Sequence, residues 1–172
     1  MKRAAAICGI VIGLAACGSN NSTPTTPTNQ PTVFTLQLKP SNEVPAITNA
    51  EASGSGTAVI TITTVKDSAG NVTSGTINFN VTMTGFPPGT SAIMAHIHGP
   101  NSTPTSTAGI FESTGLSPGA PIAMPNGSGS FNLTPNDVTP DKINQILANP
   151  AGFYFNVHTA LNPGGVMRAQ LK

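Results

Sequence analysis

Apolar and polar residues alternate with a period of two along most of the chain from Val33 onward. Successive side chains of a β-strand point to opposite faces of a sheet, so this alternation predicts strands with one buried face. The clearest runs are Phe34, Leu36 and Leu38, separated by polar residues, and Ile77, Phe79, Val81 and Met83, separated by asparagine and threonine. Further strands are predicted over residues 57–65, 91–98, 110–113, 130–133, 153–159 and 166–171.

Turn and cap residues mark the boundaries between these runs. The sequence Asp-Ser-Ala-Gly-Asn at 67–71 predicts a hairpin turn between the second and third strands. One helix is predicted over 139–149, with Thr139 as the N-cap, Pro140 in the first turn and an apolar stripe at Ile143, Ile146 and Leu147. Many short strands with one short helix predict an all-β, antiparallel, Greek-key-like sandwich or barrel, with the helix closing one end.

The phase of the alternation also predicts which side chains form the core. The apolar member of each alternating pair should face inward. The predicted core comprises Phe34, Leu36, Ile77, Phe79, Val81, Ile97, Phe131, Phe155, Val157 and Leu171.

The first residues have the composition of an export signal. Lys2 and Arg3 precede a short apolar run that ends in Leu14-Ala15-Ala16-Cys17, and the run is too short to span a membrane as a helix. This ending resembles the lipobox of bacterial lipoproteins, in which cleavage precedes a cysteine that then carries the lipid. The resemblance implies a signal peptide over 1–16 and a lipid on Cys17 that attaches the protein to a membrane. The alternative, an ordinary cleavage site followed by an incidental cysteine, stays open.

The composition of the mature chain limits where the protein can be located and which partners it can bind. Residues 17–32 contain Thr, Pro, Asn and Ser and no large apolar side chain, which predicts a flexible tether to the lipid. Loss of Lys2 and Arg3 leaves five basic and six acidic residues, so no basic patch favours nucleic acid as a partner. Cys17 is then the only cysteine, and the domain over 33–172 must fold without an internal disulfide. We expect an extracytoplasmic, lipid-anchored location in the bacterial cell envelope.

All three histidines of the chain lie in two predicted strands and should share a face. His96 and His98 are two residues apart, while Ala95 and Ile97 take the opposite face, and His158 alternates with Phe155 and Val157. Imidazole is a common metal ligand, so a three-histidine site for copper or zinc is predicted if the two strands are neighbours.

Four further polar or soft residues accompany the histidines. Met94 falls on the face of His96, and its thioether would favour Cu(I). Arg168 should lie opposite Asn156 or His158, where its charge would lower the pKa of His158. Arg168 can equally bind an anion, pair with Glu43 or lie as a solvated charge at the sheet edge. Without a metal, the histidines can be structural groups that hydrogen-bond to loop backbone, Glu43 or Asn156.

Several segments together resemble one known family, the CHRD domain, named after chordin. They are Phe34-Thr35-Leu36, Asn42-Glu43-Val44-Pro45, Ala95-His96-Ile97-His98-Gly99, Phe155-Asn156-Val157-His158-Thr159, Asn162-Pro163-Gly164-Gly165 and Arg168-Ala169-Gln170-Leu171. The resemblance implies an all-β extracellular domain over nearly the whole mature chain and implies no particular reaction. The family often has an acidic residue after the paired glycines, where this chain has Val166.

Three classes of function follow from these observations. The preferred one is a binding or structural module with a metal site at His96, His98 and His158. The second is a redox enzyme that uses this metal, because the spacing loosely resembles copper–zinc superoxide dismutase, although no further histidines are present to hold a second metal. The third is a structural or adhesive module, without metal, that binds a protein or polysaccharide. No Gly-x-Ser-x-Gly motif supports a hydrolase.

Overall fold

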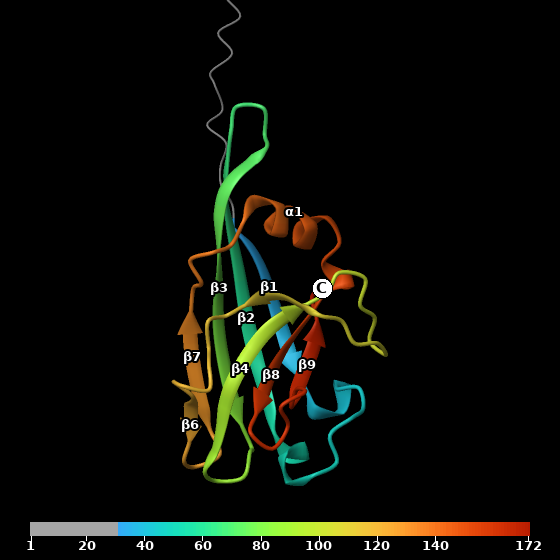
Figure 1. Cartoon of the computed structure of the whole chain (residues 1–172), viewed down its shortest axis with the longest axis vertical. Coiled ribbons are helices and arrows are strands. Elements are labelled where there is room, and N and C mark those ends of the chain that lie inside the picture. The colour runs from blue at the N-terminus through green and yellow to red at the C-terminus, as the bar shows by residue number, and fades with distance from the viewer. Residues whose placement is uncertain (1–30) are drawn as a thin grey trace, which may run out of the picture.

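Two antiparallel sheets pack face to face in the computed structural model, which describes residues 31–172 (Figure 1). The first sheet has the strand order β1 (Thr32–Leu38), β2 (Ser55–Lys66), β3 (Val72–Thr84) and β7 (Gly129–Leu133). The second has the order β5 (Ile110–Ser113), β4 (Thr90–His98), β8 (Tyr154–Thr159) and β9 (Met167–Gln170), with β6 (Ile122–Met124) also paired to β4. The predicted all-β sandwich is confirmed.

Strands β2 and β3 form a long hairpin at the predicted turn. The Asp67 carboxylate accepts hydrogen bonds from the backbone N–H groups of Ala69 and Asn71, both at 2.9 Å. The hairpin extends beyond the rest of the sandwich, past the end at which the helix lies (Figure 1). An aspartate that bonds its own downstream backbone is the reason this short sequence turns sharply.

The single α-helix of the described residues, α1 (Pro140–Ala148), begins where its capping residues predict. The Thr139 hydroxyl accepts a hydrogen bond from the N–H of Lys142 at 3.4 Å. Ile143 and Ile146 are buried. Lys142 also forms an ion pair with the buried Glu112 at 2.8 Å, which ties the helix to β5. The 3-10 turns η1 (Pro40–Asn42), η2 (Ala50–Ser53) and η3 (Pro150–Gly152), and the three-residue β6, were not predicted from the pattern.

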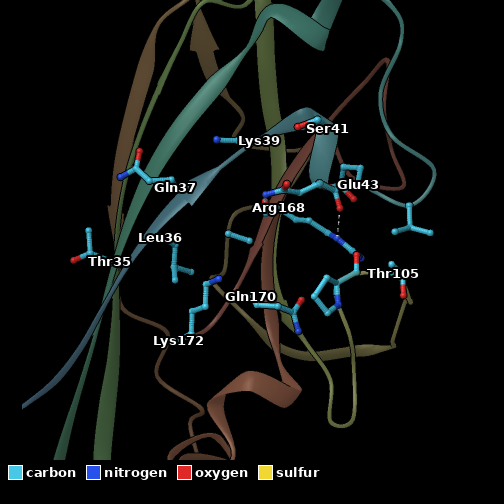
Figure 2. Close-up of a pocket in the computed structure, with 14 residues that line it drawn as sticks. Thr35, Leu36, Gln37, Lys39, Ser41, Glu43, Thr105, Arg168, Gln170 and Lys172 are labelled. Carbon is cyan, nitrogen blue, oxygen red and sulfur yellow. Dashed lines mark hydrogen bonds between the residues drawn. The ribbon is translucent and has the colours of Figure 1, made fainter.

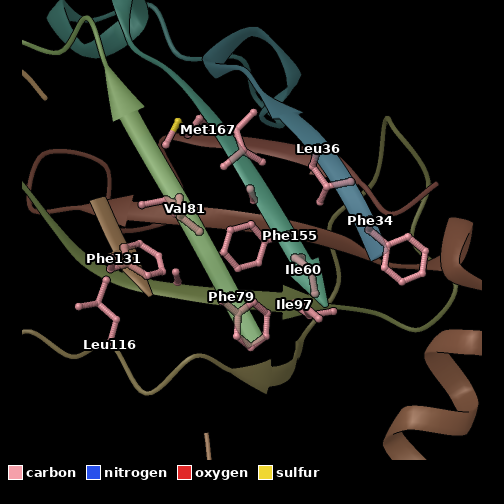
Figure 3. Close-up of a cluster of buried hydrophobic side chains, with 14 of the residues drawn as sticks. Phe34, Leu36, Ile60, Phe79, Val81, Ile97, Leu116, Phe131, Phe155 and Met167 are labelled. Carbon is pink, nitrogen blue, oxygen red and sulfur yellow. The ribbon is translucent and has the colours of Figure 1, made fainter. Parts of the chain in front are cut away.

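The space between the sheets is filled by alternate side chains from both (Figure 3). All ten residues of the predicted core are buried. Phe79 of β3 and Phe155 of β8 stack across the interface, with their ring centroids 5.6 Å apart. The sandwich therefore depends on contacts between strands far apart in the sequence, and the strand phases inferred from alternation are confirmed.

The predicted export signal, Cys17 and the predicted tether up to residue 30 lie outside the described residues. Strand β1 begins at Thr32, one residue before the predicted start of the domain. Within residues 31–172, no helix has the length and apolar character needed to cross a membrane.

Removing the aromatic ring of Phe155 should severely destabilise the sandwich. Phe155→Ala leaves a cavity between the sheets and removes the stack with Phe79, so we expect a loss of about 3–5 kcal/mol in the free energy of unfolding. Chemical denaturation measures it. The control is Val65→Ala, because Val65 is 48% exposed and should change stability by less than about 0.5 kcal/mol. Equal losses in both variants would contradict this account of the core.

Candidate functional site: a buried histidine cluster

The outer face of the second sheet carries the polar residues that the sequence singles out. Strands β4, β8 and β9 are neighbours. Their register pairs His96 with Asn156, and Asn156 in turn with Arg168. The same register pairs His98 with Tyr154. Residues directly opposite each other in neighbouring strands share a face, so the pleat alone brings these side chains into one layer.

His96, His98 and His158 come together as a buried cluster. Each offers one ring nitrogen, and these nitrogens all lie within 4.8 Å of one another. The Nδ1 atom of His96 is 3.1 Å from Nε2 of His158. Two nitrogens bound tetrahedrally to one zinc ion lie roughly 3.3 Å apart, given metal–nitrogen bonds of about 2.0–2.1 Å. His96 Nδ1 and His158 Nε2 therefore have nearly the spacing of two ligands of one ion, which would replace the proton that they share.

Backbone carbonyls fix the tautomers of two of the histidines. Nδ1 of His98 lies 2.9 Å from the carbonyl oxygen of Ala108, and Nδ1 of His158 lies 2.9 Å from that of Pro163. A carbonyl oxygen only accepts, so both Nδ1 atoms carry the proton and both Nε2 atoms carry a lone pair. The contact between His96 and His158 then has His96 as the donor. His98 Nε2 is buried and has no hydrogen-bond partner among the described residues.

Burial keeps the three imidazoles neutral. It lowers the pKa of His96 to about 4, and repulsion from His158 and His98 adds to the effect. Burial also lowers the pKa of His98, against the hydrogen bond to Ala108 and with a smaller contribution from the charge of Arg168. The pKa of His158 is lowered by burial, against the bond to Pro163. Near neutral pH all three rings are therefore uncharged, which is the form that binds a metal ion. Nε2 of His98 and of His158 carries a lone pair, and Nδ1 of His96 becomes a ligand once its shared proton is displaced.

The loop after β8 holds the carbonyl that orients His158. The buried Glu51 carboxylate accepts hydrogen bonds from the Thr159 hydroxyl and the Asn162 side chain, which anchors the loop at both ends. Gly165 closes the loop with a positive φ of +129°, and a Cβ there would lie 2.5 Å from Asn156 Nδ2 and 2.8 Å from Glu43 Oε1. Only glycine fits, because both the backbone angle and the contact exclude a side chain.

Comparison with known proteins assigns the chain to a family. A family model described as the CHRD domain matches residues 34–171, nearly the whole described chain. The chain belongs to the CHRD domain family. No curated protein and no solved structure matched it. The predicted family is therefore confirmed, and the assignment brings no reaction or ligand with it.

A buried arginine organises the loops around the histidines of this CHRD domain. The side chain of Arg168, which is 1% exposed, donates hydrogen bonds to three backbone carbonyls: Asn42 at 2.7 Å, Pro104 at 2.7 Å and Ser106 at 2.9 Å. Figure 2 shows Arg168 between the turn that carries Glu43 and the loop that carries Thr105. Its guanidinium also lies over the ring of Tyr154, 4.4 Å from the centroid. The Tyr154 ring stacks on His98 with centroids 4.8 Å apart and an interplanar angle of 3°.

Two more polar atoms of the outer face are buried without a hydrogen bond. They are Oε1 of Glu43 and Oδ1 of Asn156. Burial raises the pKa of Glu43 to about 7, although the charge of Arg168 and a hydrogen bond from Asn156 both oppose this. Together with Nε2 of His98 they form a set of unpaired acceptors on one face, and unpaired buried acceptors are costly unless a cation or a donor satisfies them.

The structure revises the role predicted for Arg168. Its predicted pairing with Asn156 is confirmed. Arg168 is not a solvated edge charge, because it is buried and bonded to carbonyls. Its charge lowers the pKa of His98, and it is not among the causes of the shift at His158, where we expected its effect. Arg168 forms no ion pair with Glu43, since the one ion pair of the described residues joins Lys142 to Glu112.

The remaining predicted residues lie where the strand phases place them. Met94 is paired with His158 in the register of β4 and β8 and is half-buried. Val166, at the position where the family often has an acid, is buried in the core. Tyr154 was missed, although its spacing of two from Asn156 puts it on the same face. The carbonyls of Ala108 and Pro163 were also missed, and backbone acceptors leave no signal in a sequence.

The stability of the domain should depend on pH through the buried imidazoles. Below about pH 6.5 the unfolded histidines bind more protons than the native ones, whose pKa values are lowered, and His96 stays neutral down to about pH 4. The free energy of unfolding should therefore fall as the pH drops from about 6.5 toward 4, by about 1.4 kcal/mol per pH unit for each proton. Glu43 opposes this with one proton, because its raised pKa makes the native state the more protonated one between pH 4.5 and about 7.

Denaturation between pH 4 and 8 measures this slope. His96→Leu should reduce it by about one proton. The control is Asp67→Asn, since Asp67 lies in an exposed turn and has a lowered pKa, so its titration falls below this window. A slope in His96→Leu equal to that of the parent would show that His96 has the same pKa in the native and unfolded states, contrary to this account.

Replacing the guanidinium of Arg168 should loosen both loops that it joins. Arg168→Lys keeps the charge but cannot reach three carbonyls, so we expect a loss of about 2–4 kcal/mol in the free energy of unfolding. Amide hydrogen exchange should accelerate most in residues 40–45 and 99–109. Uniformly unchanged exchange and stability would mean that lysine supports the loops as well as arginine does.

Proposed function

We propose that this CHRD domain binds one copper or zinc ion through His96, His98 and His158. The observation that carries the proposal is the fixed tautomer of His98 and of His158. Metal-binding histidines usually donate their second ring N–H to a carbonyl or carboxylate, which orients the ring and leaves the other nitrogen free. Here two carbonyls accept those protons at 2.9 Å, and a third imidazole lies within ligand distance.

The donor set limits the choice of metal. Three neutral imidazoles suit zinc and copper better than magnesium or calcium, which prefer oxygen. A three-coordinate set also leaves a fourth position for water or another ligand. Met94 lies opposite His158 in the strand register, and its thioether favours Cu(I) over zinc. If Met94 contributes to the site, Cu(I) is the metal that it favours.

Burial favours binding over catalysis. The three side chains are only 5%, 7% and 4% exposed, so a substrate has little access to a metal held between them. A redox enzyme of the superoxide-dismutase type remains the second candidate, because a three-histidine copper site is suited to one-electron chemistry. Superoxide turnover by the metal-loaded protein separates the two, since a binding module shows none.

We also propose that the domain works outside the cytoplasm, anchored to the bacterial envelope by a lipid on Cys17. The basic start, the apolar run and Leu14-Ala15-Ala16-Cys17 support this. The Thr- and Pro-rich segment that follows would keep the metal site away from the membrane surface. A protein or polysaccharide of the cell surface is the proposed partner, and nucleic acid is not.

Metal should stabilise the parent protein and not a variant without the three histidines. The protein is purified without a histidine tag and titrated with Cu(I), Cu(II) or Zn(II) while metal content and melting temperature are measured. Free metal at 100 times the Kd adds about 2.7 kcal/mol to the free energy of unfolding. The variant His96→Ala/His98→Ala/His158→Ala should gain nothing, and Asp67→Asn should behave like the parent.

Two further results decide between the alternatives. Met94→Leu should weaken Cu(I) binding and leave Zn(II) binding unchanged if the thioether is a ligand or close neighbour. The metal site would be excluded if the parent bound no stoichiometric metal and if the triple variant were destabilised equally with and without chelator. The histidines would then be structural.

A further inference from the structure

Strands β1 and β9 lie at the edges of opposite sheets and pair at a single position. The bridge joins Lys39 and Arg168, whose backbone groups exchange two hydrogen bonds of 3.3 Å. If the antiparallel ladder continued, Gln37 would pair with Gln170 and Thr35 with Lys172. No such pairs form. The two sheet edges therefore separate beyond the bridge.

Within residues 31–172, backbone groups without a partner line both sides of this separation. Lys39 bonds to β9, and backbone direction alternates along a strand, so the N–H and C=O groups of Thr35 and Gln37 also point away from β2. On β9, Leu171 bonds back to Phe153 of the segment before β8, which leaves the backbone groups of Gln170 facing β1. Such edges are templates for another strand.

A cavity of about 630 Å³ runs along this separation and extends across the bridge to residues 41–44 and to Pro104 and Thr105 (Figure 2). Its walls include Thr35 and Gln37 from β1, and Gln170 and Lys172 from the other edge. Leu36 and Ala169 also line it, and both belong to the inward-facing set of their strands. The space thus has an apolar floor between two rows of backbone donors and acceptors, which is the arrangement that binds an extended peptide.

Basic side chains are concentrated around the cavity. Three of the five basic residues of the described chain line it, namely Lys39, Arg168 and Lys172. Its one acidic lining side chain, Glu43, is buried. Arg168 donates its hydrogen bonds to carbonyls, whereas Lys39 and Lys172 are exposed and form no ion pair with any described residue. The exposed charge at this site therefore complements carboxylates.

We propose that the seam between β1 and β9 binds an extended acidic segment of a partner protein as an added strand. β1 and β9 are antiparallel, so the added strand pairs with one edge in parallel and with the other in antiparallel fashion. Its inward side chains pack on Leu36 and Ala169, and its alternate, outward Asp or Glu side chains meet Lys39 and Lys172. The occupied seam joins the two sheets along one pair of edges, β1 and β9.

A defined peptide tests the proposal with the full chain. The probe is acetyl-Ser-Glu-Val-Glu-Val-Glu-Ser-amide, titrated into ¹⁵N-labelled, metal-free protein and followed by amide chemical shifts. We expect saturable shifts at Thr35, Gln37 and Gln170 and slower hydrogen exchange of those amides. Replacing the three glutamates of the probe by lysine should abolish binding. Replacing one of its valines by proline should weaken binding, because proline has no N–H to pair with the strand edge.

Charge reversal on the protein provides the matched control. Lys39→Glu/Lys172→Glu should weaken the probe about tenfold or more, whereas Lys66→Glu, on the distant hairpin, should change the Kd less than about twofold. All three lysines are exposed, so the substitutions should leave the fold intact, and the unchanged remainder of the spectrum checks this. Any of three results would overturn the proposal. They are the absence of saturable binding by the parent at about 1 mM probe, chemical-shift changes confined to other strands, and equal weakening of binding by Lys66→Glu. The result is independent of metal binding.

Discussion

The organisation of the outer polar face depends on one buried guanidinium. Arg168 reaches the carbonyls of Asn42, Pro104 and Ser106, so a single side chain connects the turn after β1 to the loop after β4. No carboxylate neutralises it directly; carbonyl oxygens and the Tyr154 ring surround it instead. The planar fork of arginine is suited to this task, because several fixed donors are satisfied at once with little loss of side-chain freedom.

That connection extends to the histidines through shared neighbours. Tyr154 contacts both the guanidinium and His98, and the loop that Arg168 holds also supplies the Ala108 carbonyl that sets the tautomer of His98. His158 receives the equivalent support from a separate loop, anchored by Glu51. The orientation of the cluster is thus determined by backbone, and the side chains that matter for it act mainly by holding loops in position.

The sequence predicted the strands and the shared face of the histidines because both depend on a period of two. The whole predicted core, including Phe79 and Phe155, follows from that period. The adjacency of β4 and β8 did not, since strand order is decided by long-range packing that one sequence does not reveal. The burial of Arg168 was not predicted either, because its partners are carbonyls of Pro104 and Ser106, and any residue type supplies those atoms.

The bridge between Lys39 and Arg168 has a mechanical consequence. Two stiff sheets that are fastened at one point along a seam can change the angle between their edges with little movement at the fastening. In such a motion the displacement of each residue grows with its distance from the bridge, so it is larger at Thr35 and Lys172 than at Gln37 and Gln170. The hydrophobic core limits the amplitude because Leu36 must stay covered. The side chain of Arg168 therefore holds the loops in place, while its backbone is the pivot about which the two strand edges beside them can open.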